Sequence, residues 1–241
     1  MSAILINGLT KKYGDFTAVD NLTLEINQGE LFSLLGVNGA GKTTAIKMLS
    51  CLIKPTSGDA ALLGNSINAQ AQAVKEIINI SPQETAVAGN LSVIENLEFI
   101  AGLYGQDKMT AKQNAQETAK KFGLENELKK KAKKLSGGMQ RRLSIAMALI
   151  TSPKILFLDE PTLGLDVIAR RELWTLIKSL KDKITMVLTT HYLEEVEALC
   201  DRVGVMAKGK LVAAGTVAEL TEQTKTKNLE DAFIVLSGGI L

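Results

Sequence analysis

One nine-residue segment, residues 36–44, constrains the fold of this chain more than any other. Its sequence, GVNGAGKTT, fits the P-loop pattern G-x-x-x-x-G-K-[ST], which joins a buried strand to a helix through a glycine-rich loop. An apolar run of five residues precedes it, Leu31–Leu35. Apolar residues follow at helical spacing: Ile46, Leu49, Leu52 and Ile53. The sequence therefore predicts a strand, a loop and a helix that continues to Ile53.

The P-loop pattern predicts a site for a triphosphate. Its glycines, Gly36, Gly39 and Gly41, leave backbone N–H groups accessible at a helix N-terminus, where anions are stabilised. Lys42 is expected to reach the β- and γ-phosphates, and the Thr43 hydroxyl to ligate Mg²⁺. A glycine-rich turn without a ligand is the alternative, and the complete pattern in its context argues against it.

The rest of the chain alternates strand-like and helix-like segments, which predicts an α/β fold with a parallel sheet. Strands are expected at residues 77–80, 155–158 and 184–189. Alternating apolar residues before the P-loop, Leu22, Leu24 and Ile26, predict a small antiparallel sheet. Residues 92–122 are predicted to be helical, with two expected capping boxes, Ser92 with Glu95 and Thr110 with Gln113.

Two adjacent carboxylates, Asp159 and Glu160, follow the apolar strand at 155–158. Ligands bind at this edge of open parallel sheets, and neighbouring carboxylates repel unless they share a cation. Asp159 is therefore expected on the Mg²⁺ side and Glu160 as the base that polarises water. A solvated acidic strand end is the alternative, which the upstream P-loop disfavours.

A second motif, LSGGMQ at residues 135–140, offers another phosphate-sized cradle. With both motifs in this order, the chain resembles the nucleotide-binding subunit of an ABC transporter. In that family the LSGG element of one protomer closes over ATP that the P-loop of another holds. The resemblance implies that Ser136, Gly137 and Gly138 contact nucleotide, although Met139 stands where most members have glutamine.

The resemblance also assigns roles to single residues. His191, the one histidine, is expected at the γ-phosphate, and Gln83 is expected to contact Mg²⁺, the attacking water and the docking site of the membrane partner. Tyr13 matches the aromatic residue that stacks on adenine, although packing within a hairpin is an equal use of it. Asp166 matches the loop that acts across the dimer interface and also suits a helix N-cap. The remaining nucleotide-binding positions implied by the resemblance are Val19, Asn38, Ala40 and Thr44.

The expected fold is a P-loop NTPase core with a parallel sheet, an N-terminal antiparallel β subdomain and an α-helical signature subdomain. All 241 residues form one domain, with the helical subdomain at about 84–152 and a helical tail at about 216–241. The two cysteines, Cys51 and Cys200, are expected to pack as small buried hydrophobes.

Composition limits the partners. A net charge of +2 is too small to indicate nucleic acid, and the basic run at 129–134 lacks aromatic residues for base stacking, so it is expected to be a solvated helix face. The sequence has no signal peptide and no apolar run of the roughly 18 residues that a spanning helix needs. A cytoplasmic chain, held at the inner face of the membrane by a permease, is therefore expected.

The resemblance implies an Mg²⁺-dependent ATPase that drives transport through that separate permease. The signature variant, the sequence after His191 and the ending LEDAF at 229–233 resemble the branch that serves drug, polysaccharide and sodium exporters. The second cassette is expected to be a copy of this chain, with a related chain as the alternative. A groove for the permease is expected after Gln83, along 92–104, with Val93, Leu97 and Ile100. A soluble ABC ATPase of translation or DNA repair is the other function considered, and a P-loop kinase does not explain LSGG.

Overall fold

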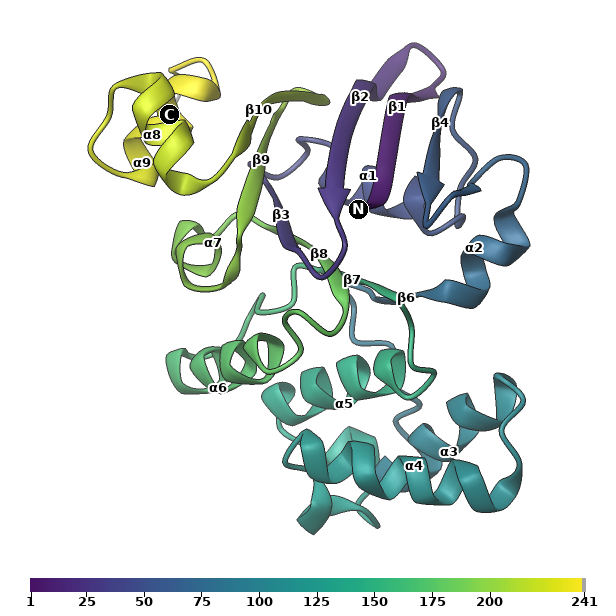
Figure 1. Cartoon of the computed structure of the whole chain (residues 1–241). Coiled ribbons are helices and arrows are strands. Elements are labelled where there is room, and N and C mark those ends of the chain that lie inside the picture. Colours follow the sequence, from purple (N-terminus) through teal and green to yellow (C-terminus); the bar gives the residue numbers. More distant parts are fainter. Residues whose placement is uncertain (240–241) are drawn as a thin grey trace.

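The fold consists of two β-sheets, a helical lobe and a C-terminal pair of helices (Figure 1), and the computed structural model describes residues 1–239. The larger sheet has the strand order β10-β9-β3-β8-β7-β6. All of its strands are parallel except β10. Its strands are β3 (Leu31–Leu35), β6 (Ile78–Ser81), β7 (Ile155–Asp159), β8 (Thr185–Thr190), β9 (Arg202–Ala207) and β10 (Lys210–Gly215).

The smaller sheet is antiparallel, with the order β2-β1-β4-β5. Its strands are β1 (Ser2–Tyr13), β2 (Phe16–Asn27), β4 (Ser57–Leu62) and β5 (Asn65–Ser66). The predicted α/β class, the parallel sheet and the N-terminal antiparallel sheet are therefore confirmed.

Alternate side chains of a buried strand pack into two different hydrophobic cores. In β7, Ile155 and Phe157 join a core shared with the antiparallel sheet and α1 (Lys42–Leu49), whereas Leu156 and Leu158 join the core of the helical lobe. Successive side chains of a strand point to opposite faces. Because β7 is buried along its whole length, it contributes to both cores.

The helical lobe lies on the second face of the parallel sheet (Figure 1) and comprises α3 (Val93–Leu103), α4 (Lys108–Lys121) and α5 (Gly137–Leu149). In α4 the buried residues are alanines at four-residue spacing, Ala111, Ala115 and Ala119. This spacing places them on one helix face, where small side chains allow a close approach of neighbouring helices. The other helices are α2 (Ala71–Ile77), α6 (Val167–Lys178), α7 (Leu193–Leu199), α8 (Val217–Thr224) and α9 (Leu229–Leu236).

Several local expectations are confirmed and several are wrong. The capping box of Ser92 and Glu95 is present, but α4 begins after Asp107, whose carboxylate accepts from the backbone of Met109 and Thr110, so Thr110 is inside the helix. The helix after the P-loop ends at Leu49, and Leu52 is 59% exposed. Just beyond the C-cap Ser50, Cys51 has a left-handed φ of 56°, which is incompatible with a continuing α-helix.

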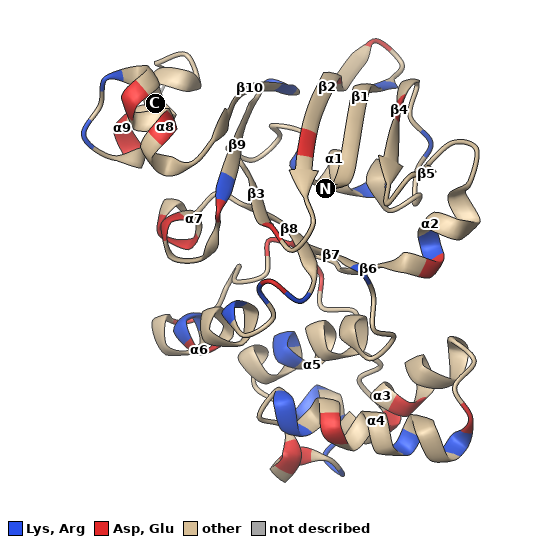
Figure 2. Cartoon of the chain, viewed as in Figure 1, with Lys and Arg blue, Asp and Glu red and all other residues tan. Residues whose placement is uncertain are grey.

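The basic run at 129–134 is not a helix face, because only a three-residue 3-10 turn, Ala132–Lys134, forms there. Ala132 is buried, and Lys131 forms an isolated bridge with Ser92. Both basic and acidic residues lie on the helical lobe (Figure 2). Both cysteines are half-buried rather than buried, although each packs against a core.

The helices α8 and α9 pack on β9 and α7 through a third core that includes Val203, Leu220 and Leu229. They occupy the expected tail at 216–241, of which the last two residues lie outside the described part. Across residues 1–239, no helix combines the length and the apolar character that crossing a bilayer requires.

A fully buried carboxyl group, that of Glu195, lies where α6 and α7 meet. Its Oε1 accepts a hydrogen bond of 3.2 Å from Nε1 of Trp174. Burial raises the pKa of this carboxyl above its ordinary value, although hydrogen bonds act in the opposite direction. The nearby carboxylate of Glu160 also raises this pKa, and the overall shift is upward. The folded chain therefore disfavours the carboxylate form of Glu195.

We expect Glu195→Gln to raise Tm near neutral pH by about 2 °C or more, because the amide oxygen still accepts from Trp174 and the variant has no carboxyl group to bury as an anion or to protonate on folding. A group with a raised folded pKa contributes stability below its unfolded pKa and loses it as pH rises through the folded value. The Tm difference between variant and wild type should therefore increase from pH 4.5 to 8. Glu197→Gln, at an exposed position of the same helix, is the matched control for thermal unfolding, and a lower Tm of Glu195→Gln at pH 8 would contradict the expectation.

Candidate functional site

A cavity of about 360 Å³ opens at the carboxyl ends of β3, β7 and β8. Ten of its lining residues were predicted from the sequence: Asn38, Gly39, Ala40, Gly41, Lys42, Thr43, Thr44, Gln83, Glu160 and His191. Three were not: Phe16, Ala18 and Leu163. The parallel sheet thus brings together segments that lie more than 100 residues apart in the chain.

The P-loop passes so close to neighbouring backbone that no other residue can replace two of its glycines. At Gly41, with φ 101°, an added Cβ would lie 2.4 Å from the carbonyl oxygen of Ala18. At Gly36 it would lie 2.5 Å from the carbonyl oxygen of Met206. The loop then leads into α1, whose first N–H groups have no partner within the helix. This arrangement suits an anion at the N-terminus of α1.

Lys42 is 5% exposed and lies inside the loop. Its Nζ donates to the carbonyl oxygens of Gly36 (2.6 Å) and Val37 (3.3 Å) and lies 3.2 Å from Oε1 of Glu160. A compact ammonium group with three donors, held at the cavity wall, matches the oxygens of a bound phosphate.

Asp159 lies at the end of β7 and is 3% exposed. Its Oδ1 accepts hydrogen bonds from the hydroxyls of Thr43 (3.0 Å) and Thr189 (2.5 Å). Residues 1–239 contain no group of three or more His, Cys, Asp or Glu side chains that could hold a metal ion. Mg²⁺ uses one or two protein oxygens together with phosphates and water, so the adjacent oxygens of Thr43 and Asp159 fit it.

Glu160 has its carboxylate between two basic groups. Oε1 faces Lys42, and Oε2 lies 2.9 Å from Nδ1 of His191. The backbone of Glu160 has a left-handed φ of 47°, and its N–H donates to the Thr189 carbonyl oxygen. Non-glycine residues in this region are strained and cluster at functional sites. The structure therefore holds a 5% exposed carboxylate at the cavity wall, within hydrogen-bond distance of a histidine.

Two aromatic residues lie at the turn between β1 and β2, and only one of them lines the cavity. Phe16, 63% exposed, lines the cavity, whereas Tyr13 lies outside the lining with the Nζ of Lys11 5.2 Å from its ring centroid. Val19 is fully buried beneath Gly41, and Ala18 lines the cavity instead. Adenine stacking by Tyr13 and a nucleotide contact by Val19 remain predictions.

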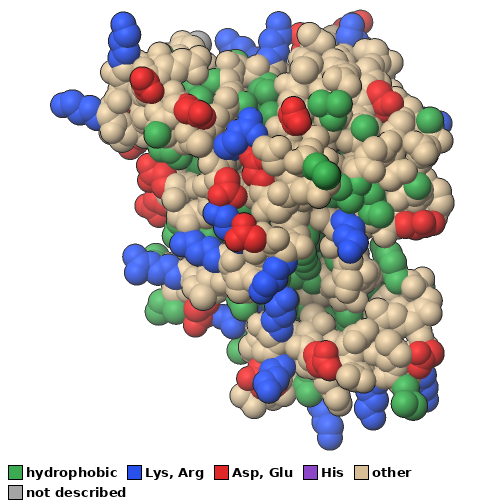
Figure 3. Space-filling model, viewed as in Figure 1, with side chains coloured by type: hydrophobic (Ala, Val, Ile, Leu, Met, Phe, Trp, Pro, Cys, Tyr) green, Lys and Arg blue, Asp and Glu red, His purple; other side chains and the backbone are tan. Residues whose placement is uncertain are grey.

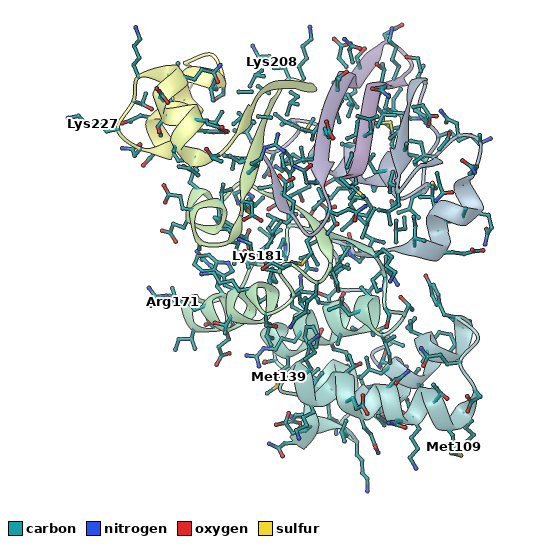
Figure 4. All side chains as sticks on the ribbon, viewed as in Figure 1. Met109, Met139, Arg171, Lys181, Lys208 and Lys227 are labelled. Atoms are coloured by element: carbon teal, nitrogen blue, oxygen red, sulfur yellow. The ribbon has the colours of Figure 1, made fainter. Side chains whose placement is uncertain are left out.

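The signature residues lie away from this cavity. Ser136 is the N-cap of α5 and accepts from the backbone N–H of Met139, and Gly137 and Gly138 form the first turn. Met139 marks this end of α5 in Figure 4. Asp166 caps α6, as predicted, by accepting from Ala169 N–H at 2.9 Å. These residues do not line the cavity of their own chain.

Sequence reasoning missed Arg141. This residue is 4% exposed, and its guanidinium donates to backbone carbonyls of both strand ends at the site. A signal was present, because Arg141 precedes Ser144, Ile145 and Ala148 at the spacing of one helix face. All four residues are buried in α5. A charged residue on such a face requires buried partners.

Comparisons with known proteins agree with this geometry. A family model described as "ABC transporter" matches residues 19–163. The "probable multidrug ABC transporter ATP-binding protein YbhF" of Escherichia coli is 39% identical over 234 residues, which are 95% of this chain and 40% of that protein. The "daunorubicin resistance ATP-binding protein DrrA3" of Streptomyces coeruleorubidus is 40% identical over 92% of this chain and 71% of its own length.

Solved structures share the fold over most of the chain. A structure of an "ATP binding subunit of ABC transporter" has a TM-score of 0.87 at 26% identity and covers 98% of this chain and 99% of its own. A dimeric, post-hydrolysis state of the ATP-binding cassette MJ0796 with ADP and Pi has a TM-score of 0.80 at 27% identity, covering 88% and 98%. Because the family model spans more than half of the chain and includes the P-loop and Glu160, this chain belongs to the ABC transporter family.

Proposed function

We propose that this chain is the ATP-binding subunit of an ABC exporter and that it hydrolyses ATP with Mg²⁺ to drive a separate membrane permease. The observation that carries the proposal is the Glu160 carboxylate, held between Lys42 and His191 at the wall of the P-loop cavity. Several relatives are named as drug-resistance ATP-binding proteins, which favours export.

The chemistry follows from the positions of the side chains. Lys42 and the N-terminus of α1 bind the β- and γ-phosphates, while Glu160 accepts the proton of the attacking water. His191 orients that carboxylate through Nδ1 and contacts the γ-phosphate. Thr43, Asp159 and Gln83 would hold Mg²⁺ together with the phosphates, and the ion would supply positive charge against the negative charge that develops in the reaction.

Two cassettes form the complete site. The signature residues of each chain lie outside its own cavity, so Ser136, Gly137 and Gly138 contact the nucleotide of the partner through a helix N-terminus. Exposed Leu163, Val167 and Ile168, next to Asp166, supply apolar surface for that contact. The partner is a second copy of this chain or a related chain, and the related solved cassette is dimeric.

The permease docks on the face where the helical lobe meets β6 of the parallel sheet. Val93 and Leu97 are fully buried and do not line this face, which corrects the expected groove. Ile100 does line a groove of about 160 Å³, together with Pro82 and Tyr104. Phe99 and Leu103, 55% and 65% exposed, continue the apolar surface. Hydrophobic side chains gather where the helical lobe meets the rest of the molecule (Figure 3).

We expect Lys42→Ala to abolish ATP turnover and to weaken ATP binding by about tenfold or more, because hydrogen bonds to charged groups contribute about 1.5–3 kcal/mol. Turnover assays and equilibrium binding with labelled ATP measure both effects. Lys47→Ala, at an exposed lysine of the same helix, is the matched control. Wild-type turnover by the Lys42 variant would overturn the assignment.

We expect Glu160→Gln to retain ATP binding but to lower kcat by at least about a hundredfold, the scale of losing a general base. With the γ-phosphate intact, closed dimers should accumulate in gel filtration with ATP and not with ADP. Glu197→Gln, at an exposed position, should behave as wild type. A Glu160 variant that stays monomeric in ATP argues against the head-to-tail dimer.

We expect cysteines at Phe99 and Tyr104 to crosslink to the co-expressed permease, in a background where Cys51 and Cys200 are replaced by serine. Met109→Cys is the control, because this residue is 84% exposed and lies outside the lining of that groove, at the lower edge of the lobe (Figure 4). Mass spectrometry of the crosslinked band identifies the partner. Crosslinks only to ribosomal proteins or to DNA-bound proteins would favour the soluble ABC ATPase.

A further inference from the structure

Arg141 uses every N–H donor of its guanidinium group on backbone carbonyls. Nε donates at 2.8 Å, Nη1 at 2.5 and 3.2 Å, and Nη2 at 2.7 and 3.0 Å. The five acceptors, in that order, are the carbonyl oxygens of Pro161, Pro82, Gln83, Asp159 and Glu160. A planar fork with five donors cannot be reproduced by another side chain.

These acceptors belong to two chain segments that no longer pair with each other. The parallel ladder of β6 and β7 ends at the pair Ser81 and Leu158. Beyond it, one segment continues to Gln83 and the other to Pro161, and the guanidinium donates hydrogen bonds to both. Arg141 therefore extends the connection between the two strands past the end of their ladder.

The charge of Arg141 is compensated over distance rather than by a direct ion pair. Burial lowers the pKa of the guanidinium to about 10, while the carboxylates of Asp159, Glu195 and Glu160 act in the opposite direction. The group is therefore protonated at neutral pH. A buried cation that binds carbonyl dipoles of a site loses its stabilisation when those carbonyls move.

We propose that Arg141 is a positioning residue for hydrolysis, through which the position of the signature helix α5 sets the position of Glu160. The proposal rests on the ATPase function proposed above. Arg141 itself lies outside the cavity lining, so it acts on the reaction through the backbone of Glu160 and Gln83. When the partner cassette binds the N-terminus of α5, the helix moves. The Arg141 side chain then transmits that movement directly to the backbone of Glu160, the catalytic base.

The guanidinium also explains how the strained backbone of Glu160 is maintained. On one side its N–H donates to the carbonyl and hydroxyl oxygens of Thr189, and on the other its carbonyl accepts from Arg141. Removal of the second contact frees the peptide that follows Glu160. A displacement of about 1 Å at a reacting group can lower a rate by about a hundredfold.

The test compares Arg141→Lys and Arg141→Gln with wild type and with the matched control Arg171→Lys, whose side chain points away from the molecule on α6 (Figure 4). A lysine keeps the charge but has three donors on one atom, so it cannot span both segments. We expect kcat to fall by at least about thirtyfold in both Arg141 variants, toward the hundredfold of a 1 Å displacement. KM for ATP and direct ATP binding should change by less than about threefold, because Arg141 does not line the cavity.

A double-variant cycle separates positioning from general loss of structure. If Arg141 acts through Glu160, the variant with both Arg141→Lys and Glu160→Gln should hydrolyse ATP no more slowly than Glu160→Gln alone. A further drop in the double variant, or equal losses in kcat and ATP binding, would overturn the proposal.

The remaining outcomes are also decisive. Wild-type kcat in Arg141→Lys would overturn the positioning role. If neither Arg141 variant unfolds cooperatively, the residue is required by the fold and the proposal is wrong. An absence of hydrolysis by the wild-type chain would contradict the proposed function, and this inference with it.

Discussion

Two adjacent carboxylates, Asp159 and Glu160, lie almost fully buried at the end of β7, and much of the site compensates their charge. Buried charges are stable only when they are paired and hydrogen-bonded. Thr43 and Thr189 donate to the first carboxylate, while Lys42 and His191 contact the second. These four residues come from α1, β8 and the loop after β8, so the compensation itself joins the P-loop to β8, the strand between β3 and β7. Electrostatic balance and the geometry for phosphate chemistry are thus produced by the same contacts.

The layered architecture makes this balance rigid. The same strand supplies Phe157 to the core beside the antiparallel sheet and Leu158 to the core of the helical lobe. A displacement of β7 would disturb both cores, which are packed at crystal-like density. The helical lobe is joined to this frame near the site through Arg141 and the Gln83 loop. The lobe that carries the signature residues is therefore attached at residues of the candidate site, Gln83 and Glu160.

Sequence reasoning succeeded where one local pattern has one physical solution and failed where a neighbour decided the outcome. The cap at Ser92 was predictable because Glu95 is three residues away and the motif is complete in sequence. The second cap was assigned to Thr110 because the same spacing recurs there, but the carboxylate of Asp107 accepts two N–H groups and begins the helix earlier. Val93 and Leu97 had the spacing of an amphipathic stripe, and only packing against the rest of the lobe shows which way that stripe faces.

The sequence by itself determined the family, the α/β class and most of the residues that line the cavity, because a P-loop requires particular residue types at particular spacings. It also placed Asp159, Glu160 and His191 at strand ends. The tertiary structure decided which of these residues touch, since pairing Glu160 with both Lys42 and His191 depends on the order of strands in the sheet. It alone decided that Phe16 lines the cavity and that Arg141 binds two strand ends. Contacts between residues distant in the chain depend on strand order and helix packing, and neither of these is encoded in local spacing.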